Sequence, residues 1–214
     1  MTRIVPDDAA GRAAAIEVLE RDGIVALPTD TVYGLAVRLD SPGGLERLFA
    51  LKRRPPERGI VLLLADASQA AELADVEPLT SALAAAFWPG GLSLVLPIRA
   101  GANLPAALTG GAATVGLRVP DHPAPRALAR AVGPLPTTSA NVSGEPEAGD
   151  AAAVAAQLGP GVDLILDGGP ASGGPPSTVV AVADGEARML REGAIPAARV
   201  GAVVERQGSR FVGR

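Results

Sequence analysis

Four basic residues lie close together in the segment LKRRPPERG, residues 51–59. They are Lys52, Arg53, Arg54 and Arg58, and two prolines keep this stretch from continuing as a helix. A guanidinium group matches two phosphate oxygens at once, so the cluster indicates a site for a polyphosphate. Basic side chains also offset the dipole at the C-terminal end of a helix, and this segment alone does not decide between the two interpretations.

Small hydroxyl and amide side chains gather in PTTSANVSG, residues 136–144, where Ser139, Asn141 and Ser143 alternate before a glycine. Such residues cap helices and form turns. They also make a cradle for a small polar ligand when they lie at a helix entrance. The chain has no GxSxG pattern, and no Asp or His is placed to activate Ser139. We therefore expect Ser139 to bind a ligand and not to attack one.

Two further groups of polar residues are associated with strands. Thr29, Asp30, Thr31 and Tyr33 follow a short buried strand, which is where open α/β sheets place ligands. Arg118 lies inside the strand-like run TVGLRVP. It either faces solvent or, if it points inward, binds a carboxylate, because an unpaired buried charge is costly.

Composition limits the function classes. The 214 residues are 48% hydrophobic and only 2% aromatic, so the core is aliphatic. The net charge of 19 − 23 = −4 argues against a protein that coats nucleic acid, but it allows a local basic cleft. There is no cysteine, and His122 is the only histidine, so we interpret His122 as structural and expect no protein-built metal site. Trp88 is expected in the core.

The start of the chain lacks a signal-peptide core, and the longest apolar runs have only strand length. We therefore expect a cytoplasmic protein that does not enter a membrane.

The apolar pattern predicts one α/β domain over residues 1–214, with a mixed sheet flanked by helices. Asp7 or Asp8 is expected to cap the first helix, and Gly23 to end it. Helices are predicted over residues 7–22, 41–51, 67–74, 78–87, 123–132 and 151–158. Strands are predicted over residues 24–27, 60–64, 92–97, 113–120, 135–139 and 162–166, with a hairpin of 177–182 and 187–193 around Asp184 and Gly185. Residues 167–177 are expected to be irregular, and a short tail follows Pro196.

Seven segments in this order and spacing resemble the YrdC/Sua5 family, and the resemblance extends over residues from about 10 to 195. They are PTDTVYGL (28–35), LKRRPPERG (51–59), FWPGGLSLVLP (87–97), TVGLRVPDHP (114–123), TTSANVSG (137–144), STVV (177–180) and LREG (190–193). The resemblance implies a single YrdC-like domain, a twisted open sheet with a basic concave face. It also implies synthesis of L-threonylcarbamoyladenylate from L-threonine, bicarbonate or CO2, and ATP, with release of pyrophosphate. That product serves the t6A modification of adenosine 37 in tRNA.

The family's KxR and SxN motifs are both intact here, and the resemblance implies that Lys52, Arg54, Ser139 and Asn141 form the catalytic set. The residues implied to bind ATP are Lys52, Arg54, Arg58, Thr114, Ser139, Asn141, Glu147 and Arg191. Those implied to bind threonine are Thr31, Arg118, Thr137 and Ser177. A magnesium ion is expected to accompany ATP, with phosphate oxygens and water as most of its ligands.

The chain also departs from longer members of the family. It has Leu63 where they often carry a histidine, and it stops soon after LREG, so we expect no Sua5-type C-terminal domain. A short member is expected to pass its product to separate t6A transferase proteins, with at most weak contact to tRNA. The alternative is a YciO-like nucleotide- or RNA-binding protein of the same fold without synthase activity. A carbamoyl-transfer module of hydrogenase maturation is disfavoured, because that domain sits in longer, cysteine-bearing chains.

Overall fold

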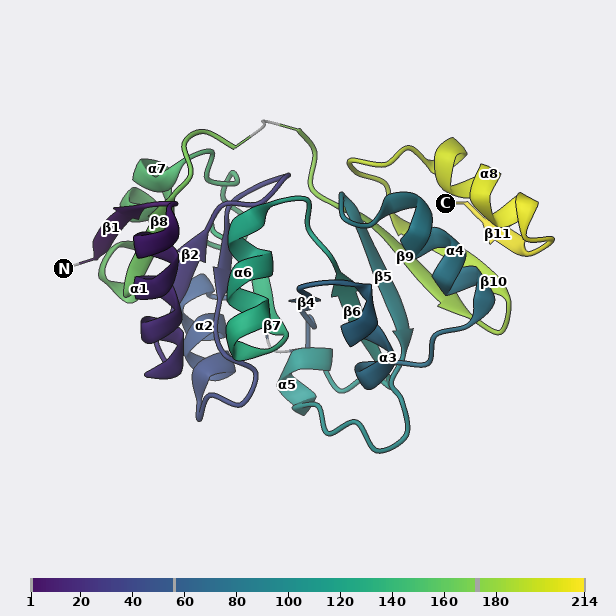
Figure 1. The fold of residues 1–214 in the computed structure, drawn as a ribbon, viewed down its shortest axis with the longest axis horizontal. Coiled ribbons are helices and arrows are strands. Elements are labelled where there is room, and N and C mark those ends of the chain that lie inside the picture. The colour runs from purple at the N-terminus through teal and green to yellow at the C-terminus, as the bar shows by residue number, and fades with distance from the viewer. Residues whose placement is uncertain (1, 56, 172–173, 214) are drawn as a thin grey trace.

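The computed structural model describes residues 2–55, 57–171 and 174–213. Its strands are β1 (Arg3–Pro6), β2 (Val25–Leu27), β3 (Gly34–Ala36), β4 (Val61–Leu63), β5 (Leu92–Pro97), β6 (Thr114–Arg118), β7 (Leu135–Ser139), β8 (Leu164–Asp167), β9 (Thr178–Ala183), β10 (Glu186–Arg191) and β11 (Arg210–Val212). Within these ranges they form one twisted sheet in the order β1-β8-β2-β3-β7-β4-β6-β5-β9-β10-β11 (Figure 1). The pairing of β4 with β6 is parallel and that of β5 with β6 is antiparallel, so the predicted open mixed sheet is confirmed.

Helices cover both faces of the sheet. They are α1 (Ala9–Glu20), α2 (Gly44–Lys52), α3 (Ala70–Leu73), α4 (Pro78–Phe87), α5 (Ala106–Thr109), α6 (Pro123–Val132), α7 (Ala151–Leu158) and α8 (Ala197–Arg206), with short 3-10 turns at Ala67–Gln69 and Gly159–Gly161. Strand β2 shows why two layers form: Val25 and Leu27 pack in the layer beneath α1 and α6, whereas Ala26 packs in the opposite layer. None of the helices in the described ranges combines the length and apolarity needed to span a bilayer.

Helix α1 begins where the sequence predicted. Asp8 is its N-cap, and its carboxylate accepts a hydrogen bond from the N–H of Gly11 at 2.8 Å. Asp7 instead pairs with Arg12 at 2.6 Å. The helix ends at Glu20, before the predicted Gly23, and Asp22 takes the left-handed conformation with φ 61°. The predicted terminus was therefore too late, because an aspartate supplies the turn expected of the glycine.

The predicted hairpin is present as β9 and β10, and Asp184 and Gly185 both have positive φ, at 53° and 74°. The irregular stretch after β8 was also predicted, although Ser172 and Gly173 within it lie outside the described residues. This segment joins two distant parts of the sheet, since six strands separate β8 from β9 (Figure 1).

Five elements were missed by sequence reasoning: β1, β3, α5, α8 and β11. The expected short tail after Pro196 is instead α8, which packs on α4, followed by β11 at the edge of the sheet (Figure 1). The strands among the five are only three or four residues long, and each exists through pairing with a partner distant in sequence, such as β1 with β8. Local periodicity carries little signal for elements of that length.

Candidate functional site

A cavity of about 360 Å³ lies on one face of the sheet, where side chains from five neighbouring strands converge. Successive strand residues point to opposite faces, so alternate positions line the cavity. The strand residues at these alternate positions are Val61 and Leu63 on β4, Ser93 and Val95 on β5, Thr114, Gly116 and Arg118 on β6, Thr137 and Ser139 on β7, and Val179 on β9; Gly34 on β3 and Thr138 on β7 also line the cavity. The residues between them, such as Leu62, Leu94 and Leu117, belong to the apolar core behind the sheet.

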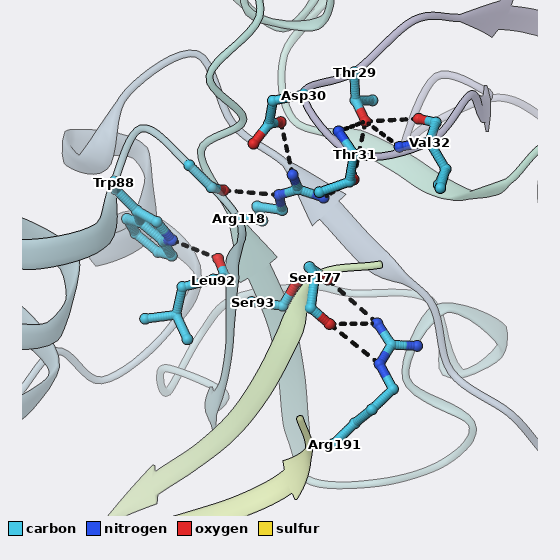
Figure 2. Close-up of polar contacts among 11 residues, drawn as sticks. Thr29, Asp30, Thr31, Val32, Trp88, Leu92, Ser93, Arg118, Ser177 and Arg191 are labelled. Carbon is cyan, nitrogen blue, oxygen red and sulfur yellow. Dashed lines mark hydrogen bonds and ion pairs between the residues drawn. The ribbon is translucent and has the colours of Figure 1, made fainter. Parts of the chain in front are cut away.

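Arg118 lies at one end of this cavity, and its side chain is only 7% exposed. Its guanidinium donates to Asp30 Oδ1 at 2.6 Å, to Thr31 Oγ1 at 3.1 Å and to the carbonyl of Gly90 at 2.9 Å (Figure 2). Burial lowers the pKa of Arg118, and the charge of Asp30 opposes that shift. Of the two possibilities for Arg118, the inward one is correct, and the carboxylate that it meets belongs to the chain itself.

The neighbouring hydroxyl groups are oriented by this network. Thr29 donates its single O–H to the carbonyl of Val32 at 2.6 Å. In the 3.2 Å contact between the hydroxyls of Thr29 and Thr31, Thr31 is therefore the donor (Figure 2). Thr31 Oγ1 accepts from Arg118, and its remaining lone pair can accept from a ligand donor such as an amine.

Ser93 and Ser177 form a second pair of hydroxyls close to Arg118. Their oxygens are 2.9 Å apart, and Arg191 donates to the Ser177 carbonyl at 2.7 Å and to its hydroxyl at 3.3 Å (Figure 2). The charge of Arg191 contributes to lowering the pKa of Arg118, so Arg191 lies within electrostatic reach of Arg118. We call the part of the cavity lined by Thr31, Ser93, Arg118, Ser177 and Arg191, with Asp30 bonded to Arg118, the Arg118 end.

Arg54 lies at the other end of the cavity. Its Nε donates to the carbonyl of Arg58 at 3.0 Å and its NH2 group to the carbonyl of Gly59 at 2.9 Å. Burial, and secondarily the charge of Arg58, lowers the pKa of Arg54. Gly59 precedes β4. In the parallel pairing of β4 with β6, Val61 lies opposite Gly116, so Gly59 and the Arg54 side chain bonded to it lie near the start of β6, whereas Arg118 lies at its end. Four residues of strand separate the two ends by roughly 13 Å.

The loop 139–143 borders the Arg54 end, because β7 runs antiparallel to β4 and finishes at Ser139. Lys52 lies behind this loop and is 1% exposed. Its ammonium donates to the carbonyls of Ser139 and Asn141 and to Asn141 Oδ1. We call the part of the cavity lined by Arg54, Thr114 and Ser139, with Lys52 and Asn141 behind it, the Arg54 end.

Glu147 is the one carboxylate among the described residues that line the cavity. Its charge opposes the lowering of the pKa of both Lys52 and Arg191, so it lies within electrostatic reach of both ends. In the described ranges no three His, Cys, Asp or Glu side chains gather as they would to hold a metal ion. A magnesium ion that entered with a polyphosphate would find Glu147 as a protein ligand and take its other ligands from phosphate and water.

His122 and Tyr33 support the elements around the cavity, and Tyr33 also lines it. His122 Nδ1 accepts the N–H of Ala124 at 3.2 Å and so caps α6, and its partial burial lowers its pKa, which agrees with a structural role. The hydroxyl of Tyr33 donates to the carbonyl of Gly169 at 2.7 Å and accepts the N–H of Gly168 at 3.1 Å. Tyr33 thereby joins the polar loop after β2 to the stretch that follows β8.

The structure brings most of the predicted site residues together. Those that line the cavity are Thr31, Arg54, Thr114, Arg118, Thr137, Ser139, Glu147, Ser177 and Arg191. Lys52 and Asn141 lie behind it, and Arg58 is exposed outside it. Sequence reasoning missed Ser93. The signal was present, because in LSLVLP the serine occupies the alternate phase to Leu92, Leu94 and Leu96 and thus faces away from the apolar core.

The fold is an open mixed α/β sheet with a cavity on one face and arginines at both ends, a charge pattern that suits small anionic ligands. The model of the Sua5/YciO/YrdC family, described as "Telomere recombination", matches residues 17–193. The chain belongs to the Sua5/YciO/YrdC family, as the resemblance predicted.

Individual relatives agree with this membership. A threonylcarbamoyl-AMP synthase of Bacillus subtilis (strain 168) is 38% identical over 194 residues, which cover 90% of this chain and 56% of that protein. The crystal structure of P. abyssi Sua5 complexed with L-threonine is similar with a TM-score of 0.88 and 31% identity, covering 99% of this chain and 62% of that one. The crystal structure of E. coli YciO is similar with a TM-score of 0.82 and 27% identity, and the match covers 92% of this chain and 98% of that one. The chain thus spans little more than half the length of the first relative.

Proposed function

We propose that this chain is an L-threonylcarbamoyladenylate synthase that uses L-threonine, bicarbonate or CO2, and ATP, and releases pyrophosphate. The observation that carries the proposal is the presence of two cationic ends in one cavity, Arg118 with Arg191 at one end and Arg54 at the other. A reaction that joins a small carboxylate-bearing amino acid to a nucleotide needs this arrangement. The synthase name of the B. subtilis relative and the L-threonine bound to P. abyssi Sua5 support it.

Threonine is assigned to the Arg118 end. Arg118 would pair with its carboxylate, and the acceptor lone pair of Thr31 suits a donor such as the amine. Ser177 and Thr137 would contact the rest of the molecule. Because Arg118 keeps its hydrogen bonds to Asp30 and Gly90 on one side, its guanidinium is already oriented before the ligand arrives.

ATP is assigned to the stretch from the Arg54 end to Arg191. Arg54 would bind phosphate oxygens, while Thr114, Ser139 and Glu147 lie beside it as further contacts. The charge of Arg191 acts on Arg118, so a nucleotide bound by Arg191 would have its α-phosphate close to the amino group of threonine. The two substrates would therefore meet at the Arg118 end.

The chemistry needs no protein nucleophile. The neutral amine of threonine adds to CO2 to give a carbamate, or to bicarbonate with loss of water. A carbamate oxygen then attacks the α-phosphorus, and the bond to pyrophosphate breaks. The arginines align the reactants and offset the charge that develops on the phosphate oxygens. Mg2+ bound with ATP would supply further neutralisation of the triphosphate.

The proposal extends to the cellular role. The product would serve the t6A modification of tRNA, and this chain would pass it to separate t6A transferase proteins in the cytoplasm, with at most weak contact to tRNA. The lone Trp and Tyr of the chain leave little aromatic surface for stacking bases, which argues against RNA as the main ligand.

A second candidate is a YciO-like nucleotide- or RNA-binding protein without synthase activity, because this chain covers 98% of the E. coli YciO chain. Pyrophosphate release from purified protein separates the two. With ATP, magnesium and bicarbonate present, we expect release that requires threonine. ATP binding without threonine-dependent release would reject the synthase in favour of the second candidate.

A further inference from the structure

The residues of the KxR and SxN motifs fall into two pairs by position. Arg54 and Ser139 line the cavity, whereas Lys52 and Asn141, 1% and 7% exposed, lie behind it among the described residues. A lysine in a phosphate site is usually assumed to touch the phosphate as a point charge. The contacts of this lysine lead to a different role.

All donors of Lys52 are already used within the protein. An ammonium group has three N–H donors. Nζ contacts the carbonyl of Ser139, the carbonyl of Asn141 at 2.6 Å and Asn141 Oδ1 at 3.3 Å. Three acceptors for three donors leave no N–H for a phosphate oxygen.

The amide of Asn141 is used in the same way. Its Nδ2 group donates to the carbonyls of Val142 at 3.1 Å and Glu145 at 2.7 Å. Its Oδ1 accepts from Ser139 Oγ at 2.6 Å and from Lys52. The N–H of Ser143 closes the network by donating to the carbonyl of Lys52 at 2.9 Å. Lys52 therefore holds this loop with both its side chain and its backbone.

Arg54 differs in the donors that remain. Its guanidinium has five N–H groups, and the two bonds to the carbonyls of Arg58 and Gly59 leave three of them for a ligand. Among the residues of the two motifs, Arg54 is the cation that both faces the cavity and keeps donors for phosphate.

We propose that Lys52 and Asn141 are positioning residues, which hold residues 139–143, including the Ser139 hydroxyl that donates to Asn141, in the shape that borders the nucleotide bound by Arg54. This inference rests on the proposed function, because it assumes a nucleotide at the Arg54 end. Lys52 acts on that nucleotide through the loop and does not touch it.

The charge of Lys52 gives the arrangement a pH dependence. Burial lowers the pKa of Lys52 to about 8; the charge of Arg54 lowers it further, and the charge of Glu147 opposes the shift. The neutral amine has two N–H groups and a lone pair, so one of the three oxygens loses its donor and faces that lone pair. We therefore expect the loop to loosen as the pH rises above about 8.

The contribution of Lys52 to the stability of the whole protein increases as the pH rises, while its hold on the loop weakens. The folded-state pKa lies below the ordinary value of 10.5, so between about 8 and 10.5 the unfolded chain binds more protons than the folded one. The free energy of unfolding contributed by this group therefore rises with pH in that window. A loss of nucleotide affinity above pH 8 is thus distinguishable from loss of folding.

Amide hydrogen exchange of the ligand-free protein tests the proposal directly. Lys52→Met removes the charge and keeps an unbranched side chain, and we expect the protection of residues 140–145 at pH 7 to fall by about tenfold or more. The matched control is Arg53→Met, which removes one charge from an exposed neighbour and should leave that protection unchanged. Unchanged protection in Lys52→Met together with lost ATP binding would overturn the proposal, because Lys52 would then contact the phosphate.

A titration of the wild-type protein keeps the test decisive if Lys52→Met does not fold. Calorimetry with a non-hydrolysable ATP analogue between pH 7 and 9.5 should show weakening affinity above about pH 8. A pH-independent nucleotide affinity would contradict the positioning role. Neither hydrogen exchange nor nucleotide binding depends on catalysis. A failure to release pyrophosphate would therefore reject the synthase assignment without changing the conclusion about Lys52.

Discussion

Arg118 and Arg54 bring the same guanidinium group to the two ends of one cavity, but they are held in different ways. Arg118 extends from a central strand, is nearly fully buried, and is fixed by a carboxylate, a hydroxyl and a carbonyl. Arg54 extends from the segment between α2 and β4, is half-buried, and contacts two backbone carbonyls. A pre-organised end suits a small ligand of fixed shape, whereas an end built on loops suits a flexible polyphosphate.

Removal of Arg118 should have the largest effect of the changes at the two ends of the cavity. Arg118→Met takes away the proposed partner of the substrate carboxylate and removes the ion pair that Arg118 forms with Asp30. We expect threonine-dependent turnover to fall by about a thousandfold or more, and the free energy of unfolding by about 3 kcal/mol. Pyrophosphate release and chemical denaturation measure the two effects.

The double variant Asp30→Asn/Arg118→Met serves as its control, since it removes both charges together. Stability should largely return while activity stays lost, because replacing both members of a buried pair costs less than removing one. Threonine affinity that survives in Arg118→Met would show that the carboxylate binds elsewhere.

The second prediction concerns the other end. Arg54→Ala should lower ATP-dependent turnover by about a hundredfold or more and leave the fold intact, with a loss of stability of about 1 kcal/mol. Arg58→Ala should have a smaller effect, because Arg58 is exposed and its charge is screened by solvent. Thermal unfolding and nucleotide titration of both variants check this, and wild-type turnover in Arg54→Ala would remove the phosphate assignment.

The third prediction tests whether the substrates lie over β6, between the Arg118 end and the Arg54 end. Gly116 lines the cavity there, and a Cβ at this position would meet Val61 Cγ2 at 3.2 Å. Gly116→Ala should lower turnover by about tenfold, because a shift of about 1 Å in a reacting pair is costly. Its unfolding midpoint should stay near that of the wild type. An unaffected rate would place the reacting groups away from β6.

The smallest effect is expected at Ser93, which orients Ser177 without being required for charge pairing. Ser93→Ala removes one hydrogen bond of about 1 kcal/mol, so KM for threonine should rise about fivefold with little change in kcat. Ser68→Ala, at an exposed turn, is the matched control. If KM for ATP rose instead, Ser177 would belong with the nucleotide.

Much of the fold could be predicted from the sequence because its central strands are continuous apolar runs. The prediction of a strand over 60–64 matches β4, and that over 92–97 has the bounds of β5. Strands β1 and β11 could not be predicted this way, since three or four residues gain strand structure only from a partner elsewhere in the chain. The same is true of the role of α8, whose apolar face is used because α4 and β11 lie against it.

The candidate site shows the same limit. The sequence predicted the residue types correctly, and Arg54, Arg118 and Ser139 do converge on one cavity. It did not indicate that Lys52 would face a loop, that Asp30 would hold Arg118, or that Ser93 would pair with Ser177. Each of these depends on residues that are distant along the chain, as with Ser93 and Ser177.

By itself the sequence determined the fold class, the family and the set of groups available: arginines for anions, hydroxyls for a small polar ligand and no activated nucleophile. Only the tertiary structure decided which of these groups are free to bind. A cation's role depends on how many of its donors the protein already uses, and that number depends on long-range contacts. Lys52 and Arg54 are two residues apart, yet the donors of Lys52 are all bonded to a loop, whereas Arg54 keeps donors for a ligand.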